Sequence, residues 1–208
     1  MKERPILFSG AMVRALLDGR KTQTRRVVKW PKDMEIDHAA VERLATSNDT
    51  YLLDRCPYGV PSDRLWVRET TYDVERNGYV GPVFVESEDG EHAHAWGWGD
   101  PDDPDQIEPH ELRKRPAIHM SRAMARIILE VTCVRVERLQ DIQSADAGSE
   151  GVEQMAPCRW RDYSGIFEDG HINPVASFAS LWDSLNAVRG YGWDVNPWVW
   201  VIEFRRIN

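Results

Sequence analysis

The segment 126–139 constrains the fold most, because it carries the most regular strand pattern in this chain of 208 residues. Its side chains fall alternately on two faces of an extended backbone: Ile128, Glu130, Thr132 and Val134 on one, and Ile127, Leu129, Val131 and Cys133 on the other. A period of two over this length predicts a β-strand rather than a helix. We therefore expect a fold that is organised around a sheet.

Shorter segments with the same kind of signal predict further strands, and they are 6–8, 21–28, 64–69, 79–86 and 198–204. The predicted helices are short and scattered: one capped by Ser9 and ended by Gly19, one at 39–45, one at 144–150 closed by Gly151, and an amphipathic one at 174–188 that carries Phe178, Leu181, Trp182 and Leu185. Strands dominate and do not alternate regularly with helices. We therefore predict an α+β fold, a small mixed β-barrel with peripheral short helices.

The composition excludes several classes of protein. No apolar run approaches the roughly 18 residues that a membrane-spanning helix needs. The first residues are charged and are followed by only a short apolar stretch, which is not the pattern of a signal peptide. The three cysteines are an odd number at wide spacing, which argues against a disulfide framework and suits a reducing compartment. We expect a cytoplasmic protein with no membrane partner.

The negative charge of the chain is local. Ten acidic residues and no Lys or Arg lie between Glu86 and Glu111, and without them 24 acidic and 26 basic residues remain. The net charge of −8 is therefore a poor argument against a polyanionic partner. We predict a single domain over 1–208 with an acidic loop insert at about 86–116, where 89–115 forms a long surface excursion. Nine tryptophans either pack in the core or offer stacking surfaces for a base.

Metal and phosphate motifs give no support for a cofactor. His92 and His94 would share one side of an extended chain, near Asp100, Asp102 and His110, but no cysteine stands at a usual zinc spacing. A solvated loop is the preferred interpretation of this segment. The glycine-rich motifs that cradle phosphates or dinucleotides are absent from the sequence. We therefore predict no cofactor and no metal site.

The segment after Gly19 gathers four cations within seven residues: Arg20, Lys21, Arg25 and Arg26. Lys21 falls where a helix end turns into a strand, so Thr24 can lie close to its ammonium. Threonine is a poor nucleophile unless a base activates it, and a partly buried lysine with a lowered pKa supplies such a base. Glu69 and Glu150 are candidates for a third group. A basic surface turn and a solvated helix-end carboxylate are the structural alternatives.

The segment from Gly19 to Thr24 resembles the G-x-K-x-x-T signature of the ASCH family, with Gly19, Lys21 and Thr24 at the fixed positions. Further blocks look like the longer ASCH proteins of phages and prophages: Pro5–Ser9, Cys56–Gly59, Asp63–Glu69, Ile118–Met120 and Asp194–Val201. The resemblance implies a PUA-like β-barrel that binds RNA or a nucleoside in a cleft beside the motif. Small bacterial members are N4-acetylcytidine amidohydrolases that use a Lys, a Thr and a Glu.

Three residues of this chain match that catalytic set. Lys21 and Thr24 fall on the first two members, and Glu150 follows the Leu139–Ile142 stretch and Ala147 at the family's spacing. The implied reaction removes the acyl group from an N4-acylated cytosine nucleoside or nucleotide. Thr24 would attack the acyl carbonyl, and Lys21 would activate Thr24 or stabilise the oxyanion. Glu150 would pass a proton to the leaving amine.

The resemblance also suggests which residues contact the substrate. Arg20, Arg26, Trp66 and Glu69 are the predicted substrate-binding residues, with Arg25 as substrate-facing or structural support. The partner is then a cytosine nucleoside or nucleotide, with RNA as a further candidate. Two alternatives remain: an ASCH module that binds RNA without catalysis, and a ribonuclease.

Overall fold

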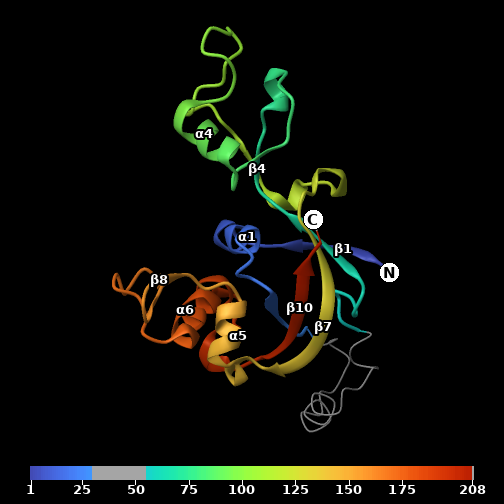
Figure 1. The fold of residues 1–208 in the computed structure, drawn as a ribbon, viewed down its shortest axis with the longest axis vertical. Coiled ribbons are helices and arrows are strands. Elements are labelled where there is room, and N and C mark those ends of the chain that lie inside the picture. The colour runs from blue at the N-terminus through green and yellow to red at the C-terminus, as the bar shows by residue number, and fades with distance from the viewer. Residues whose placement is uncertain (30–54, 208) are drawn as a thin grey trace. The chain divides into compact units, whose positions relative to one another are not determined.

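The computed structural model describes residues 1–29 and 55–207. The strands are β1 (Glu3–Leu7), β2 (Gln23–Val27), β3 (Arg64–Arg68), β4 (Thr71–Tyr72), β5 (Val83–Phe84), β6 (Lys114–Arg115), β7 (Ile128–Arg138), β8 (Gln154–Ala156), β9 (Arg159–Trp160) and β10 (Trp198–Arg206). The α-helices are α1 (Gly10–Leu17), α4 (Glu88–Trp96), α5 (Ser144–Ser149) and α6 (Pro174–Asn186) (Figure 1). Single 3-10 turns occupy Glu75–Asn77, Ala117–His119, Arg122–Met124, Leu139–Asp141, Ala187–Arg189 and Trp193–Val195. The helix predicted over 39–45 lies outside the described residues.

The main sheet has the strand order β1-β3-β7-β10-β2. Its two end strands, β1 and β2, are not paired with each other among the described residues, so the sheet is not a closed barrel. The α+β class is confirmed, whereas a closed barrel is not observed. Alternation along a sequence predicts strands, but closure depends on pairing between two edge strands that lie far apart in the chain.

The contacts of the chain divide it into two compact units. The first comprises Met1–Lys2, Ala15–Arg64 and Glu130–Arg206, and the second comprises Glu3–Arg14, Leu65–Leu129 and Ile207–Asn208. The single domain over 1–208 stays a prediction. No described helix is both long enough and apolar enough to cross a membrane.

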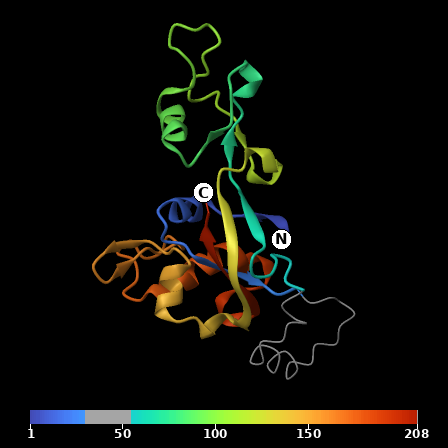
Figure 2. The same ribbon diagram turned by 45° about the vertical axis from the view of Figure 1, so that its right-hand side comes forward.

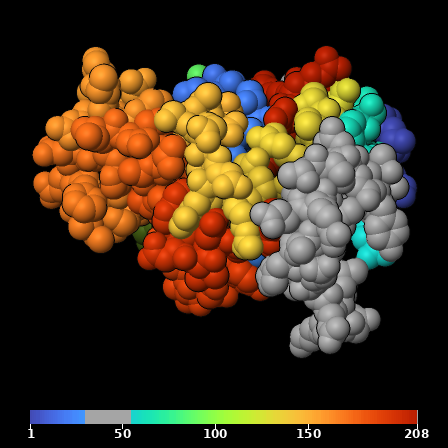
Figure 3. All heavy atoms as spheres, turned by 90° about the horizontal axis from the view of Figure 1, so that it is seen from below, coloured from blue at the N-terminus to red at the C-terminus, as the bar shows by residue number. Residues whose placement is uncertain are grey.

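The first unit holds β2 and β10 with α5 and α6. The two strands pair antiparallel, with Thr24 opposite Ile202 and Arg25 opposite Val201. Side chains alternate along β2, so Gln23 and Arg25 share a face, and Gln23 Nε2 donates to the Asp146 carbonyl of α5 at 3.2 Å. Helix α5 therefore lies on this face, and Figure 3 shows its amber atoms beside the orange atoms of the segment that follows it.

Helix α6 follows the predicted pattern closely. Asn173 caps its first turn by accepting from the Val175 amide at 2.9 Å, and Pro174 occupies the first position, where its missing N–H costs nothing. The predicted apolar face is buried at Phe178, Leu181 and Trp182, while Leu185 is exposed.

The second unit contains a small sheet, β5-β4-β6, and α4. Its own core consists of Tyr72, Val74, Val83, Ala93 and Ile107. The predicted strand over 79–86 shortens to β5, and Figure 2 shows this part of the chain from a second side.

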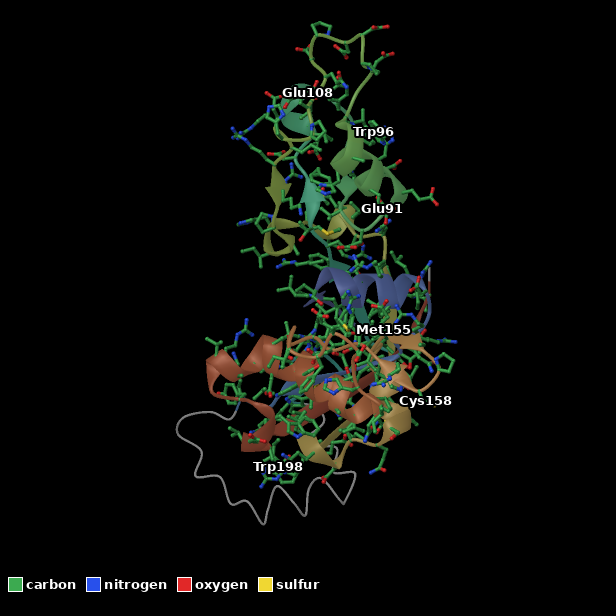
Figure 4. The ribbon with its side chains drawn as sticks, turned by 90° about the vertical axis from the view of Figure 1, so that its left-hand side faces the viewer. Glu91, Trp96, Glu108, Met155, Cys158 and Trp198 are labelled. Atoms are coloured by element: carbon green, nitrogen blue, oxygen red, sulfur yellow. The ribbon has the colours of Figure 1, made fainter. Side chains whose placement is uncertain are left out.

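The segment 89–115, predicted as a long surface excursion, contains most of helix α4 at its start. Ser87 accepts from the Gly90 amide at 3.1 Å, and three acidic residues occupy the first turn, where the helix dipole favours them. Only Gly90 and Ala93 of the helix are buried, so no apolar periodicity marks it in the sequence. Figure 4 labels Trp96 at the end of this helix, and the residue is 72% exposed.

Candidate functional site

Lys21 lies in the turn between α1 and β2. Gly19 ends the helix with a φ of +73°, a conformation that glycine adopts without strain, as predicted. The Lys21 amide then donates to the Ala15 carbonyl at 3.0 Å, which ties the turn back to α1. The strand predicted from residue 21 begins at Gln23. Lys21 is therefore held at the corner that the sequence indicates, and its side chain points into the protein.

Glu150 lies at the end of α5, as its sequence context predicts. Its amide donates to the Asp146 carbonyl at 2.8 Å, and Gly151 follows with a φ of +87°. A Cβ atom at Gly151 would lie 2.9 Å from the Cβ atoms of both Ala15 and Lys21. The absence of a side chain at this position therefore lets the end of α5 approach the Lys21 turn.

The two elements bring Lys21 and Glu150 into direct contact. Lys21 Nζ lies 3.1 Å from Glu150 Oε2 and donates to the Glu150 carbonyl oxygen at 2.7 Å. The two side chains are 1% and 3% exposed, so both charges are shielded from water. An ion pair in this environment is much stronger than the same pair on a surface, but it must also offset the cost of desolvation.

Burial sets the protonation chemistry of this pair. Desolvation lowers the pKa of Lys21 below its ordinary value of 10.5, while the charge of Glu150 and its hydrogen bond act in the opposite direction. The cations Arg26 and Arg25 lower the pKa of Lys21 further. The balance favours the neutral amine more than in water, and a neutral amine is what a general base requires.

Thr24 is the second residue of β2 and is buried. Strand alternation places its side chain on the face opposite to that of Gln23 and Arg25. Among the described residues, no hydrogen bond joins its hydroxyl to Lys21 or Glu150. The structure therefore pairs the lysine with the glutamate but does not join the threonine to them.

Arg25 is buried and bound to carboxylates, which the sequence reasoning did not anticipate. Its Nη1 donates to Glu150 Oε1 at 3.0 Å, and its Nη2 lies 3.2 Å from Asp146 Oδ2 and also contacts Glu137 Oε1. Its guanidinium lies 5.8 Å from the ring centre of Phe178. These contacts are structural, and the role of Arg25 toward a substrate stays a prediction.

The two arginines predicted to bind substrate differ in exposure. Arg20 has a side chain that is 40% exposed, and it contacts Asp18 at 2.9 Å and the Gly151 carbonyl at 3.1 Å. Arg26 is half-buried; burial lowers its pKa, an effect that the neighbouring Arg189 reinforces and that Tyr58 and Glu150 oppose. Both belong to the first unit, like the Lys21–Glu150 pair.

Trp66 and Glu69 belong to the second unit. The Trp66 ring is buried, and the Arg68 guanidinium lies 4.8 Å from its centre. Glu69 is 1% exposed, and both of its carboxylate oxygens bind Arg126, at 2.8 to 3.2 Å. The substrate-binding role of these two residues stays a prediction, since their observed contacts are with arginines of the protein itself.

The histidine pair has a different geometry from the one that the sequence suggested. His92 and His94 lie in α4, where residues two apart point to different sides, rather than on one side of an extended chain. Among residues 1–29 and 55–207, no group of three or more His, Cys, Asp or Glu side chains is arranged to hold a metal ion.

The sequence and the structure were compared with known proteins, and no similar protein was found. No protein-family model matches the sequence, and neither the curated proteins nor the solved structures contain a match. Membership of the ASCH family therefore remains a proposal that rests on the motifs of the sequence.

Proposed function

We propose that this protein is an amidohydrolase that removes the acyl group from N4-acylated cytosine nucleosides or nucleotides, as its resemblance to ASCH proteins implies. One observation carries the proposal. The buried contact between Lys21 and Glu150, with a lowered pKa at the lysine, is an acid–base pair formed by two members of the proposed catalytic set. The two structural alternatives, a surface lysine and a solvated helix-end carboxylate, would both leave the charged groups in water, whereas here both groups are buried.

The proposed reaction uses the pair as a proton store. A proton shift from Lys21 to Glu150 across the 3.1 Å contact gives a neutral amine and a carboxylic acid. The amine accepts the Thr24 hydroxyl proton as Oγ1 attacks the acyl carbonyl carbon and forms a tetrahedral intermediate. The acid donates its proton to the exocyclic nitrogen as the C–N bond breaks, which releases cytidine. Water then hydrolyses the Thr24 ester, releases the carboxylic acid and regenerates the hydroxyl.

The mechanism requires Thr24 to meet Lys21 in the substrate complex. Hydrogen bonds of catalytic groups are often long in free enzymes and tighten when the substrate binds. Only two residues separate Thr24 from Lys21 in the sequence. Lys21 lies in the turn after Gly19, and Thr24 lies in the strand that follows this turn. We therefore propose that substrate binding shifts the start of β2, so that the Thr24 hydroxyl, which alternation places on the face opposite Arg25, comes within reach of the neutral amine.

Hydrolysis of N4-acetylcytidine tests this proposal directly, because loss of the acyl group shifts the ultraviolet absorbance of the base. We expect wild type to be active, and Lys21→Met to lose about 10²–10⁴-fold in kcat, the usual contribution of a positioned base. Thr24→Ala should abolish the activity. Thr22→Ala is the matched control, because Thr22 is an exposed threonine in the same turn.

Two results would reject the amidohydrolase. If wild type does not hydrolyse any of a panel of N4-acylcytidines, the proposed activity is wrong. If Thr24→Ala remains active, Thr24 is not the nucleophile. Thermal melting of each variant separates lost chemistry from lost folding.

The geometry gives less support to the RNA-binding alternative. Phosphate binding needs exposed cations, but Lys21 and Arg25 direct their charges into buried carboxylates. Arg20 is the member of the basic segment with the clearest exposure to solvent. A salt-dependent shift of labelled RNA that survives in Thr24→Ala would favour this alternative over the enzyme.

A further inference from the structure

Each oxygen of the Glu150 carboxylate has its own cationic partner. Lys21 Nζ lies 3.1 Å from Oε2, and Arg25 Nη1 lies 3.0 Å from Oε1. The Arg25 side chain is completely buried, and it reaches Glu150 from the middle of β2. A carboxylate held at both oxygens cannot rotate freely, so the oxygen that faces Lys21 is defined by Arg25.

We propose that Arg25 is a positioning residue, which fixes the Glu150 carboxylate so that one oxygen always faces the Lys21 amine. This inference rests on the proposed deacylase function, because the orientation matters for proton transfer between these two groups. Arg25 makes no proton transfer itself, since a guanidinium does not lose its proton in proteins.

Further charges hold Arg25 in place. Its Nη2 contacts Glu137 of β7 and lies 3.2 Å from Asp146 of α5. These two carboxylates also bind Arg135, which lies 3.0 Å from Glu137 Oε2 and 3.8 Å from Asp146 Oδ2. Supporting contacts of this kind commonly orient a functional group and are required for its full effect.

The network also biases the proton on Lys21. Arg25 shares the negative charge of Glu150 and lies near the ammonium, so its charge lowers the pKa of Lys21, as that of Arg26 does. Loss of the Arg25 charge leaves Glu150 to stabilise the protonated lysine alone. The pKa of Lys21 then rises, so the Lys21–Glu150 pair keeps its single proton up to a higher pH.

The experiment compares two substitutions of Arg25 with one of Arg135. Arg25→Gln removes both the positive charge and the ion pair with Glu150. Arg25→Lys keeps the charge but loses the planar set of N–H donors of the guanidinium. Arg135→Gln removes a charge from the same network, and its contacts in the described part of the chain are with Glu137, Asp146 and Glu203 rather than Glu150.

Kinetics on N4-acetylcytidine should separate these variants. We expect Arg25→Gln to lower kcat about 10–100-fold with little change in KM, the effect typical of a lost supporting contact. It should also move the basic limb of the kcat/KM profile, where the pair loses its single proton, to higher pH. Arg25→Lys should keep the wild-type basic limb but lower kcat, and Arg135→Gln should lower kcat less than Arg25→Gln does and leave the limb in place. Equal losses in Arg25→Gln and Arg135→Gln, without a shift of the limb, would overturn the inference.

A second measurement does not depend on activity. The chain has five lysines, so the ¹³Cε signals of labelled lysine are few, and Lys21→Met identifies the one that belongs to Lys21. We expect this signal to titrate at higher pH in Arg25→Gln than in wild type, and an unchanged titration in the folded variant would contradict the role of Arg25. If Arg25→Gln does not fold, the kcat of Arg25→Lys decides, because a value equal to that of wild type would remove the positioning role. Inactive wild type would instead reject the proposed function.

Discussion

The Lys21 ammonium lies 3.1 Å from Glu150 Oε2, although the two residues are 129 positions apart in the sequence. The contact joins the turn after α1 to the end of α5, and both side chains are almost completely buried. Burial has two opposite effects on this ion pair. It strengthens the attraction between the two groups, and it also destabilises each charge by removing water.

We predict that breaking this pair from one side destabilises the protein. Lys21→Met leaves Glu150 with Arg25 as its cationic partner, and Glu150→Gln leaves a buried ammonium without its carboxylate. Each change should lower the free energy of unfolding by about 3 kcal/mol, the usual cost of removing one partner of a buried pair. The double variant should lose less than the sum of the two, because it leaves neither charge alone. Urea denaturation of the four proteins measures this coupling, and additive losses would show that the two groups do not interact.

The lowered pKa of Lys21 predicts a pH dependence of stability. Between the folded-state pKa and the ordinary value of 10.5, Lys21 is protonated in the unfolded chain but neutral in the folded protein. The unfolded state then binds more protons, so the contribution of Lys21 to the free energy of unfolding rises with pH through this window. Denaturation of wild type and Lys21→Met at a series of pH values isolates the effect as a difference. A difference that falls with rising pH would mean that the pKa is raised instead.

Gly151 should be intolerant of a side chain. Its φ of +87° disfavours other residues, and an added Cβ would lie 2.9 Å from the Cβ atoms of Ala15 and Lys21. We expect Gly151→Ala to destabilise the protein by about 2 kcal/mol or more, through backbone strain and overpacking, and to disturb the Lys21–Glu150 pair.

Gly148 supplies the control for this change. It lies within α5, and nothing lies within 4 Å of a Cβ built there. Gly148→Ala should stabilise the protein by about 0.5–1 kcal/mol, because alanine is the better helix former. Thermal melting of both variants checks the prediction, and equal effects would show that the space beside Lys21 is not limiting.

Glu69 provides a test of its predicted role as a substrate-binding residue. Its carboxylate binds Arg126 through both oxygens and is almost completely buried, so Glu69→Gln should destabilise the protein by about 2 kcal/mol through the loss of a charge-assisted pair. From this geometry we expect the KM for N4-acetylcytidine to stay near the wild-type value. A large rise in KM in a protein that is still folded would instead favour direct contact with the substrate.

Several local elements follow from short-range patterns alone. The alternation over 126–139 predicts β7, and Asn173, Pro174 and the apolar face of 174–188 predict α6. Gly19 and Gly151 end their helices as predicted, because a positive φ is a local property of glycine. Helix α4 was missed because it buries only two small residues, although Ser87 and the acidic first turn were a usable signal.

Tertiary structure decided the rest of the candidate site. The composition of 19–26 predicts a basic segment, but the sequence does not show that Arg25 turns inward to three carboxylates while Arg20 remains half in solvent. Ion pairs between distant residues depend on how strands and helices pack, and neither periodicity nor propensity records that packing. The sequence by itself therefore determined β7, α6 and the glycine ends of α1 and α5. Only the folded chain decided that Lys21 and Glu150 meet, because that contact requires two turns with positive φ to bring α1 and α5 together.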